Sequence, residues 1–534
     1  MINLDYLYNP DAVKGAFDKN YFVDKKLGFQ VIEHGTILPH KKSFDGKVAK
    51  AGQDYGGIVE SNGKFIQSSF LRYGWGGQAY TPKHESIQHS VETVVYLGMF
   101  NYTWGHILTD CISRIWFLKS DIFQREFKNC PLVYTFWESH SHEIPKNFRR
   151  LLEILEVDVD RLQPITQPTQ YNNIILPDVS FDSYFTSQYR ETIDFVREFA
   201  LKNRMPTASK KIYYYYGKRT FGEERLAEYF KSKGYEIIRP ETLTLDEQLN
   251  LLINCESFAS PLGSVSHNSL FLPDDAETIF IPRATRRFTS HQPIINQVHP
   301  LNIKYIDSIL SIFDGTQYLD HSCFVISPQL KRFFGDKWNG YEEDDFKTFL
   351  QYVKDSMGRG RNVNPTTKEY YAPILEDFMS QLKQHEDLIA TYDMPPRWEE
   401  FRSTLTYQTH IAKKGWGAWN NEEEISNDIA QKLDIQAIKI NFPKHKVYYS
   451  VYFNEQEGWS EEVSSPEMAG TTGKSKAIYG IRIRLDEARQ KEFDILYRVH
   501  KFDGEWTDWA KNGETIYSYG QKLNALQIKL EPKT

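Results

Sequence analysis

The chain has 534 residues, more than a single hydrophobic core usually serves, so we expect several domains. Its 64 lysines and arginines stand against 71 aspartates and glutamates, and the formal net charge of −7 lacks the basic surplus of a nucleic-acid-binding protein. No run of apolar residues approaches the roughly 18 of a membrane span, and the N-terminal residues do not form a secretory signal. We expect a cytoplasmic protein, with peripheral attachment to the inner face of the membrane as a further option.

Between residues 60 and 205, short apolar runs alternate with amphipathic stretches. The pattern predicts strands at 91–100, 131–137 and 171–177, and helices at 104–119, 147–157 and 189–203. Alternating strands and helices at this spacing are typical of an α/β fold with a parallel sheet. Met205 and Pro206 break the last helix, so we interpret residues 1–205 as a first Rossmann-like lobe.

A second series of the same kind follows the break. It predicts strands at 210–219, 235–240, 256–264 and 277–283, and helices at 222–234, at 244–254 and from about 266. Thr244 with Glu247 three residues later is a capping box, which marks the start of a helix. We interpret residues 206–305 as a second Rossmann-like lobe, which would bind a nucleotide, with a cleft between the two lobes.

The remainder of the chain changes character twice. Helices predicted at 340–357 and 368–390 make residues 306–396 a mainly helical region that braces or links the lobes. Beyond it, residues 397–534 contain short alternating strands in an internal repeat that occurs three times. Each copy is too small to bury its own apolar face, so the three must close on one another. We predict an all-β repeat domain with a pseudo-threefold axis, of trefoil or prism type.

A histidine and an aspartate open the helix that follows the strand at 91–100. His106, Asp110 and Arg114 are spaced by four residues, so they share one face of a helix whose start faces the carboxyl end of the sheet. A histidine oriented by a carboxylate one turn later is suited to take a proton from a hydroxyl group. The alternative is a ladder of ion pairs on the helix surface.

A glycine loop in the second lobe is the candidate phosphate site. Gly263 and Ser264 precede a predicted helix start, which would present backbone N–H groups and the positive end of a helix dipole to a diphosphate. Lys218 and Arg219, at the end of a predicted strand, would add positive charge to the same phosphates. The alternatives are a tight strand-to-helix turn and a solvated strand end.

No metal site is expected. The four cysteines are too widely spaced for a zinc site or a disulfide framework, and they are most simply buried thiols. Asp158 and Asp160 form a DxD pattern, but they end a helix, which favours a solvated helix end over a cation site.

Four of these segments occur in an order that resembles a known family. They are GHILTDCISRIWFL (105–118), the strand end KR (218–219), PETLTLDEQ (240–248) and GSVSHN (263–268). Together they resemble glycosyltransferase family 61 over roughly residues 90–285. The resemblance implies a GT-B-like pair of Rossmann-like lobes, with the acceptor bound by residues 1–205 and the nucleotide sugar by residues 206–305. It also implies an inverting transferase that moves a sugar from the nucleotide donor to a hydroxyl of the acceptor. It implies no required metal or other cofactor, and we expect a UDP-sugar as donor.

The resemblance also implies roles for individual residues. His106 and Asp110 fall on the histidine and aspartate of the family and would be the catalytic pair. The residues that would bind the donor are Lys218, Arg219, Glu241, Glu247, Gln248, Gly263, Ser264 and Asn268. The segment GKRTFGEERL lacks the usual asparagine before its glutamate, which leaves the roles of Glu223 and Glu224 open.

The C-terminal repeats are similar to clostridial hydrophobic tryptophan repeats, which implies a setting at the cell surface or near carbohydrate. The repeated tryptophans are Trp416, Trp419, Trp459, Trp506 and Trp509. We interpret them as repeated core residues, with an exposed platform for sugar rings as the alternative. Glu462 occupies the place of a second tryptophan in the middle copy, so three binding sites would not be equal.

The sequence thus predicts an inverting glycosyltransferase of bacterial surface polysaccharide or glycoprotein synthesis. Its partners would be a nucleotide sugar and a glycan or glycoprotein acceptor. His106 would take the acceptor proton while Asp110 holds the ring, or Asp110 would itself be the base. The alternative from another class is a non-catalytic carbohydrate- or cell-wall-binding protein.

Overall fold

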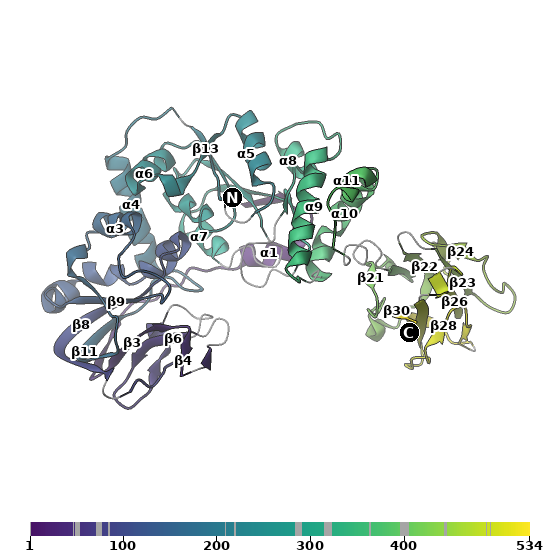
Figure 1. The fold of residues 1–534 in the computed structure, drawn as a ribbon, viewed down its shortest axis with the longest axis horizontal. Coiled ribbons are helices and arrows are strands. Elements are labelled where there is room, and N and C mark those ends of the chain that lie inside the picture. Colours follow the sequence, from purple (N-terminus) through teal and green to yellow (C-terminus); the bar gives the residue numbers. More distant parts are fainter. Residues whose placement is uncertain are drawn as a thin grey trace. The chain divides into compact units, whose positions relative to one another are not determined.

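The computed structural model describes residues 2–45, 47–48, 54–70, 77–83, 86–208, 210–217, 220–283, 291–313, 323–361, 365–395, 405–442, 446–487, 489–491, 493–518 and 520–533. The chain divides into two compact units, residues 1–393 and 394–534. The first unit is mixed α/β and contains parallel strands, and the second is built from antiparallel sheets (Figure 1).

One sheet of the first unit is six-stranded and wholly parallel, in the order β1-β16-β15-β14-β12-β13. Its strands are β1 (Ile2–Tyr6), β12 (Lys211–Tyr214), β13 (Glu236–Ile238), β14 (Ser257–Pro261), β15 (Glu277–Ile281) and β16 (Asn302–Ile306). The connections contain α5 (Glu223–Ser232), α6 (Leu245–Ile253), the 3-10 helix η8 (Ser266–Phe271) and α7 (Gln292–Val298). The start of the chain therefore completes this sheet, because Ile2 pairs with Ile303 at its edge.

The second sheet of this unit has eight strands, in the order β10-β9-β8-β11-β3-β6-β7, with β2 also paired to β11. The strands are β2 (Phe29–Glu33), β3 (Thr36–Lys41), β6 (Tyr55–Val59), β7 (Phe65–Ile66), β8 (Gln88–Phe100), β9 (Leu132–Phe136), β10 (Leu162–Pro164) and β11 (Thr169–Pro177). Strands β8, β9, β10 and β11 are parallel neighbours, and β2, β3, β6 and β7 add an antiparallel half. The helix α1 (Asp11–Asp18) and a short hairpin of β4 (Ser43–Phe44) and β5 (Lys47–Val48) precede or interrupt these strands.

The helix predicted at 104–119 is wrong as a continuous element. The structure has α2 (Trp104–His106), the π-helix η3 (Ile107–Cys111) and the 3-10 helix η4 (Ile115–Lys119), followed by the π-helix η5 (Phe123–Phe127). Two side-chain hydroxyls satisfy carbonyls of this segment: the Thr109 hydroxyl donates to the Gly105 carbonyl at 2.9 Å, and the Tyr189 hydroxyl of α4 (Ser187–Lys202) donates to that of Leu108 at 2.6 Å. The first bond is local, whereas the second is tertiary and stabilises the irregular segment in a way that no periodicity in the sequence reveals.

A single hydrophobic core joins the two sheets through the helices α3 (Lys146–Ile154), α4 (Ser187–Lys202) and α6. In Figure 1, α3 and α4 lie between strands β8 and β9 on one side and α6 on the other. Leu151, Ile193 and Leu249, one from each helix, are almost completely buried in this core. The shared core explains why both sheets belong to one compact unit.

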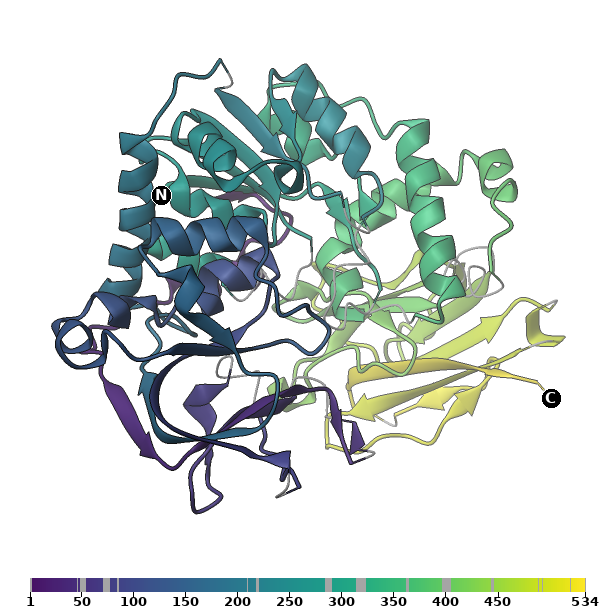
Figure 2. The same cartoon turned by 60° about the vertical axis from the view of Figure 1, so that its left-hand side comes forward.

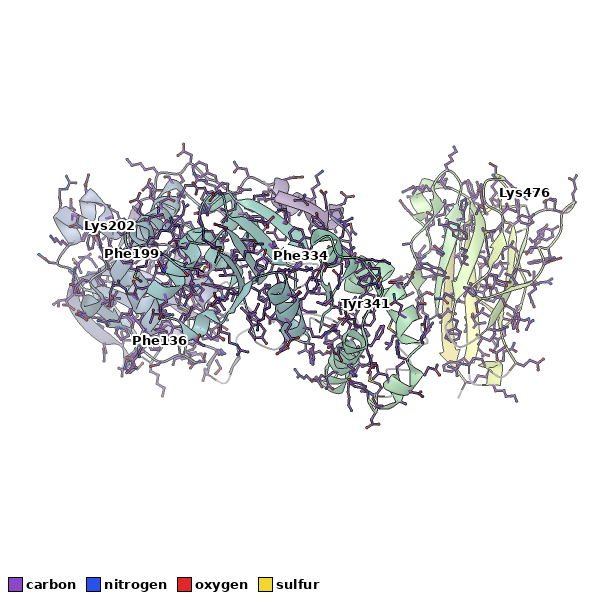
Figure 3. The ribbon with its side chains drawn as sticks, turned by 90° about the horizontal axis from the view of Figure 1, so that it is seen from above. Phe136, Phe199, Lys202, Phe334, Tyr341 and Lys476 are labelled. Atoms are coloured by element: carbon purple, nitrogen blue, oxygen red, sulfur yellow. The ribbon has the colours of Figure 1, made fainter. Side chains whose placement is uncertain are left out.

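A helical region follows the six-stranded sheet and packs against it (Figure 2). It consists of β17 (Ile309–Leu310), β18 (Cys323–Phe324), α8 (Pro328–Phe333), α9 (Glu343–Gly358), α10 (Pro365–Leu382) and α11 (Glu386–Ala390). Phe334, just after α8, meets Phe230 of α5 with ring centroids 5.5 Å apart. Within the helical region, Tyr341 meets Phe378 of α10 at 4.6 Å. Phe334 and Tyr341 are labelled in Figure 3. No helix among the described residues is long and apolar enough to cross a membrane.

A buried carboxylate ties this helical region to the carboxyl ends of β1 and β16. Asp307, directly after β16, accepts a hydrogen bond of 2.9 Å from the backbone N–H of Tyr8 and another of 2.9 Å from the hydroxyl of Tyr370 in α10. Its side chain is excluded from solvent, and burial raises the pKa of Asp307 to about 7 despite these two donors.

The raised pKa of Asp307 predicts a specific pH dependence of stability. Because the folded state keeps the proton up to about pH 7 while the unfolded chain loses it near pH 4, stability should fall as the pH rises through this window, by up to about 4 kcal/mol. Asp307→Asn should remove this component, so the variant should gain on the wild type as the pH rises. Urea unfolding across the window measures it, with Asp275→Asn at an exposed position as control. Parallel curves for wild type and Asp307→Asn would contradict the prediction.

The second unit contains three antiparallel sheets, one built around each copy of the repeat. The long strand pairs are β19 (Thr406–Ile411) with β22 (Ile435–Asn441), β23 (Val447–Tyr452) with β26 (Gly480–Leu485), and β27 (Phe493–Lys501) with β30 (Leu523–Pro532). Short strands complete the sheets: β20 (Gly415–Trp416), β21 (Asn420–Asn421), β24 (Val463–Ser464), β25 (Met468–Gly470), β28 (Ala510–Lys511) and β29 (Ile516–Tyr517).

The three copies exchange hydrogen bonds in a closed cycle. Strand β25 of the second copy pairs with β22 of the first, and β29 of the third pairs with β26 of the second. The cycle closes because the Glu423 N–H of the first copy donates to the Ile528 carbonyl of the third. Tyrosine hydroxyls follow the same order: Tyr449 accepts from the Ile440 N–H at 3.1 Å, and Tyr407 accepts from that of Ile528 at 3.2 Å. Each copy is therefore completed by its neighbour, as three incomplete units require.

Removing one of these hydroxyls should destabilise the second unit. Tyr449 is fully buried and also donates to the Glu467 carbonyl, so Tyr449→Phe leaves two backbone groups without a partner and should cost about 1–3 kcal/mol. Urea unfolding of residues 394–534 measures the change. Tyr448→Phe, at the adjacent half-buried position, is the control and should be nearly neutral. Equal effects of the two substitutions would show that the closing bonds contribute nothing.

Candidate functional site

His106 and Asp110 form a close pair just beyond the carboxyl end of β8, a central strand of the eight-stranded sheet. Nδ1 of His106 lies 2.5 Å from Oδ2 of Asp110, and the Thr109 hydroxyl donates to the same oxygen at 3.2 Å. The Asp110 side chain is 2% exposed, whereas that of His106 is 20% exposed. The aspartate is thus a buried anchor, and the imidazole is the part of the pair that a bound molecule can reach.

Arg114 does not join this pair, contrary to the spacing argument. The turn after η3 breaks the helical period, and the Arg114 side chain passes Gly98 and donates to the Ser68 carbonyl. Only 2% of the residue is exposed, and burial lowers the pKa of Arg114 to about 10. The prediction that Arg114 shares a helix face with His106 and Asp110 is therefore wrong, and so is the alternative of an ion-pair ladder through all three residues.

The helix start that carries His106 lies directly against the glycine loop of the other sheet. A Cβ atom built on Gly105 would lie 2.9 Å from Oγ of Ser264 and 3.2 Å from Nδ1 of His267. The Trp104 indole N–H donates to Oδ1 of Asn268 at 3.0 Å. Since Gly105 follows β8 and Ser264 follows β14, the carboxyl ends of one central strand from each sheet meet at this point. A crevice at such strand ends is where α/β sheets bind ligands.

The glycine loop is held by its own side chains. Gly263 has φ of +142°, a region that favours glycine, and its N–H donates to Oγ of Ser266 at 3.0 Å. The Ser266 hydroxyl donates to Oε1 of Gln292 at 2.6 Å. The helix that follows is the six-residue 3-10 helix η8, so the expected dipole of a longer α-helix is absent and that part of the phosphate-site argument is corrected.

A cation that the motif search did not select lies over this loop. The Nη2 atom of Arg283, which follows β15, would be 2.1 Å from a Cβ atom on Gly263. Its guanidinium also lies 4.3 Å from the ring centroid of Tyr216, which follows β12. The only signal in the sequence is a lone arginine after the apolar run Ile279-Phe280-Ile281, at the end of a parallel strand.

Glu223 binds residues on both sides of Lys218 and Arg219 in the sequence. Its carboxylate accepts from the N–H groups of Tyr216 and Gly217, the latter at 2.9 Å, and from the Thr220 hydroxyl at 2.8 Å. Burial raises the pKa of Glu223, and these donors oppose the shift. Lys218 and Arg219 themselves lie outside the described residues.

Three further residues predicted to bind the donor, Glu241, Glu247 and Gln248, lie just before and within the first turn of α6. Glu247 accepts from the Thr244 N–H and hydroxyl, both at 2.8 Å, which completes the predicted capping box and lowers the pKa of Glu247. Gln248 is buried and donates to the carbonyls of Pro240 and Leu243 at 2.8 and 3.2 Å. Glu241 lies in the exposed turn before them. Two of these three side chains thus have local bonds that hold the helix start in place.

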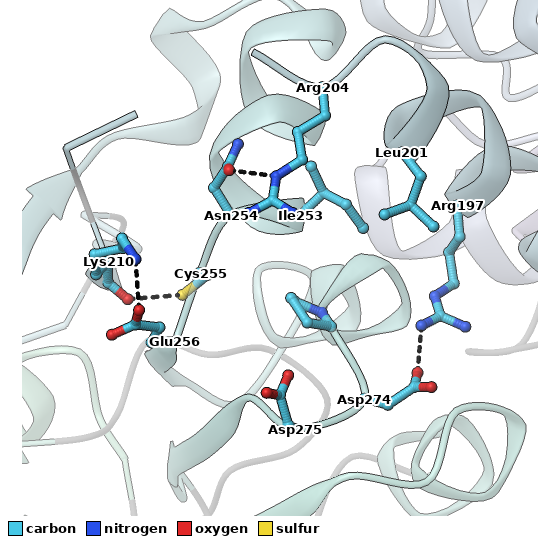
Figure 4. A pocket seen from close by; sticks show the side chains of 11 residues that line it. Arg197, Leu201, Arg204, Lys210, Ile253, Asn254, Cys255, Glu256, Asp274 and Asp275 are labelled. Carbon is cyan, nitrogen blue, oxygen red and sulfur yellow. Dashed lines mark hydrogen bonds and ion pairs between the residues drawn. The ribbon is translucent and has the colours of Figure 1, made fainter. Parts of the chain in front are cut away.

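Two cavities lie away from this region. One of about 370 Å³ is at the amino ends of β12, β14 and β15 (Figure 4). Four of its charged side chains form ion pairs, Arg197 with Asp274 and Lys210 with Glu256, each at 2.5 Å. The other, of about 460 Å³, lies between α4 and α6, and neither cavity is lined by His106 or the glycine loop.

Residues with metal-binding chemistry do not converge in the part of the chain that the structure describes: no group of three or more His, Cys, Asp or Glu side chains could hold an ion there. Asp160 of the DxD pattern is 84% exposed and pairs with Arg149 at 2.7 Å. All four cysteines are free thiols; Cys111, Cys255 and Cys323 are buried, and Cys130 is half-buried.

The repeated tryptophans of the second unit are half-buried and lie outside its hydrophobic core, so their interpretation as core residues is wrong. A cation stacks on the indole in each copy: Lys439 on Trp416 at 4.9 Å, Arg482 on Trp459 at 4.2 Å, and Arg498 on Trp506 at 4.8 Å. In the third copy Arg498 also faces Trp509 at 4.7 Å, so the guanidinium contacts two indoles. In the middle copy Glu462 binds Arg484 at 2.5 Å instead.

Comparison with known proteins identifies two regions. Residues 104–279 match the family model of glycosyltransferase 61. Residues 455–487, in the middle copy of the repeat, match that of clostridial hydrophobic W. No curated protein shows a significant match to the chain. The two regions confirm both resemblances that the sequence motifs indicate.

The close contact at Gly105 predicts that alanine destabilises the protein there but not at Gly15. Gly105→Ala should destabilise the first unit by about 1–3 kcal/mol, because the new methyl group presses on Ser264 and His267. Gly15→Ala in α1 is the control, since nothing lies within 4 Å of its added Cβ atom and alanine is the better helix former. Thermal unfolding of both variants measures the difference. A Gly105→Ala protein as stable as Gly15→Ala would mean that the two strand ends do not pack closely.

Proposed function

We propose, from the glycosyltransferase 61 domain that the chain carries, that the protein is an inverting glycosyltransferase. It moves a sugar from a nucleotide sugar to a hydroxyl of a glycan or glycoprotein. The observation that carries the proposal is the His106–Asp110 pair at the carboxyl end of β8, where Gly105 packs against the loop after β14. A base on one side and a candidate donor loop on the other are what a transfer between two bound substrates requires.

In the proposed step, His106 is the general base. Its Nε2 takes the proton of the acceptor hydroxyl while that oxygen attacks the anomeric carbon from the face opposite the leaving group, which inverts the configuration. The bond between the anomeric carbon and the diphosphate oxygen breaks, and its electrons leave with the nucleoside diphosphate. Asp110 holds Nδ1 and stabilises the imidazolium. Because Asp110 is buried and is already bound to Nδ1 of His106, it is the less suitable base.

The donor would bind at the carboxyl edge of the six-stranded sheet. The parallel strands, the meeting of two strand ends and the family match support a GT-B-like arrangement. Ser264 is the half-buried member of a loop whose neighbours are buried, so it is the loop residue nearest to solvent. We expect a UDP-sugar and no required metal, with positive side chains stabilising the leaving group.

The second unit would place a polymeric acceptor or another partner. Its cyclic bonding supports a pseudo-threefold domain of prism or trefoil type. The match to clostridial hydrophobic W supports a carbohydrate-associated setting, and with it a role in bacterial surface polysaccharide or glycoprotein synthesis. The half-buried tryptophans with stacked cations favour one alternative, a non-catalytic carbohydrate-binding protein. Sugar transfer by the purified chain separates the two.

His106→Ala should abolish transfer while leaving nucleotide binding nearly unchanged. Loss of a general base lowers the rate by about 10²–10⁴, and the proposed donor site lies on the other sheet. Turnover with a nucleotide sugar, measured beside calorimetric binding of the nucleoside diphosphate, checks both parts. The control is His89→Ala, which removes an exposed histidine from the same sheet. Turnover of His106→Ala at the wild-type rate would remove His106 from the mechanism.

A chain that ends at residue 393 should fold and still transfer sugar to a small acceptor, because every proposed catalytic residue lies in the first unit. If the second unit holds the acceptor, its loss should raise the apparent KM for a long acceptor more than for a short one. Kinetics of full-length and shortened chains on both acceptors, with thermal melts, make the comparison. Equal KM changes for the two acceptors would contradict a role in acceptor binding.

A further inference from the structure

Arg283 occupies a central position at the carboxyl edge of the six-stranded sheet. It follows β15, yet its guanidinium reaches over Gly263 at the end of β14 and faces Tyr216 beyond β12. These three strands are consecutive neighbours in the sheet, so one side chain crosses the ends of all three. The residue is 5% exposed. Burial of a cation is costly unless an anion compensates its charge.

Two neighbours are specifically suited to this guanidinium. Gly263 leaves the space it needs, because any other residue would bring a Cβ atom to 2.1 Å from Nη2. The guanidinium carbon of Arg283 lies over the Tyr216 ring, 4.3 Å from its centroid. A guanidinium binds phosphate through N–H groups that lie in its own plane, so a neighbouring aromatic ring is compatible with a contact to two phosphate oxygens.

Glu223 supplies negative charge to the same place but directs its hydrogen bonds elsewhere. Its oxygens accept from the N–H groups of Tyr216 and Gly217 and from the Thr220 hydroxyl. The charge of Arg283 still acts on the carboxyl, where it opposes the effect of burial on the pKa. Glu223 therefore holds the turn in which Tyr216 lies and helps to retain the arginine, while its lone pairs are used by the turn.

We propose that Arg283 binds the diphosphate of the nucleotide sugar and stabilises the nucleoside diphosphate as it leaves. The inference rests on the proposed function and names the cation of that site. As the bond from the anomeric carbon to the phosphate oxygen breaks, negative charge grows on the diphosphate, and the guanidinium donates hydrogen bonds to it. The main role of Gly263 is then to leave space for the Arg283 side chain. The competing explanation is that Arg283 serves only as a structural counter-ion of Glu223.

The test compares Arg283→Lys with a matched control, Arg239→Lys, in the full-length chain. Arg239 follows β13 and stacks on Tyr215 at 4.6 Å, so it repeats the arginine–tyrosine contact at the exposed edge of the same sheet. Calorimetric titration with UDP, GDP, ADP and CDP, and with the four matching nucleosides, separates the contribution of the diphosphate from that of the base and sugar. Arg283→Lys should weaken the preferred diphosphate about 10- to 100-fold and leave its nucleoside unchanged, whereas Arg239→Lys should change neither.

A second pair of variants addresses the counter-ion explanation. The Glu223→Gln variant lacks the carboxylate. If Arg283 is only its counter-ion, adding Arg283→Gln to this variant should leave diphosphate affinity unchanged. If Arg283 binds phosphate, the same change should reduce diphosphate affinity about 10-fold or more. The inference is overturned if wild type and Arg283→Lys bind the diphosphate equally well. It is also overturned if Arg283→Lys weakens nucleoside and diphosphate equally and lowers the melting temperature. Neither outcome affects the proposed function. A wild-type chain that binds none of the nucleoside diphosphates and transfers no sugar overturns the proposed function, and the inference falls with it.

Discussion

The close approach of two backbone segments at Gly105 is the constraint on which the candidate site depends. A side chain at this position would collide with Ser264 and His267, so only glycine lets the helix start after β8 pack on the loop after β14. The Trp104–Asn268 hydrogen bond holds the same contact from the side. Through it, the histidine of one sheet and the glycine loop of the other belong to one place, although about 160 residues separate them in the chain.

Several buried charged side chains lie near this contact, and each is stabilised by a different kind of interaction. Asp110 is paired with His106, Glu223 accepts bonds from the turn it organises, and Arg283 stacks on Tyr216 above Gly263. Asp307 lies further along the same strand edge, where burial raises its pKa. These charged side chains, whose burial costs free energy, lie together near strand ends, which is also where a ligand would bind.

The second unit solves a different problem. Three copies, each too small for a core of its own, share one core by lending a strand and a tyrosine hydroxyl to a neighbour. The tyrosines take the buried positions, whereas the tryptophans are half-buried, with a cation over at least one indole in each copy. The repeated residues therefore have two roles: the tyrosines join the three copies, and the tryptophans form part of the surface of the domain.

The sequence by itself determined the parallel strands, the capping box at Thr244, the threefold repeat and the two family resemblances, because these depend on periodicity and on residues close together in the chain. It also paired His106 with Asp110, since one helical turn joins them. The tertiary structure decided what local pattern cannot encode. The π-helix after His106 is stabilised by Tyr189 from another helix, the first strand pairs with Ile303 from a distant segment, and Arg283 reaches Gly263 across a neighbouring strand end. Each of these contacts joins residues whose separation along the chain leaves no periodic trace, so only the packed fold reveals them.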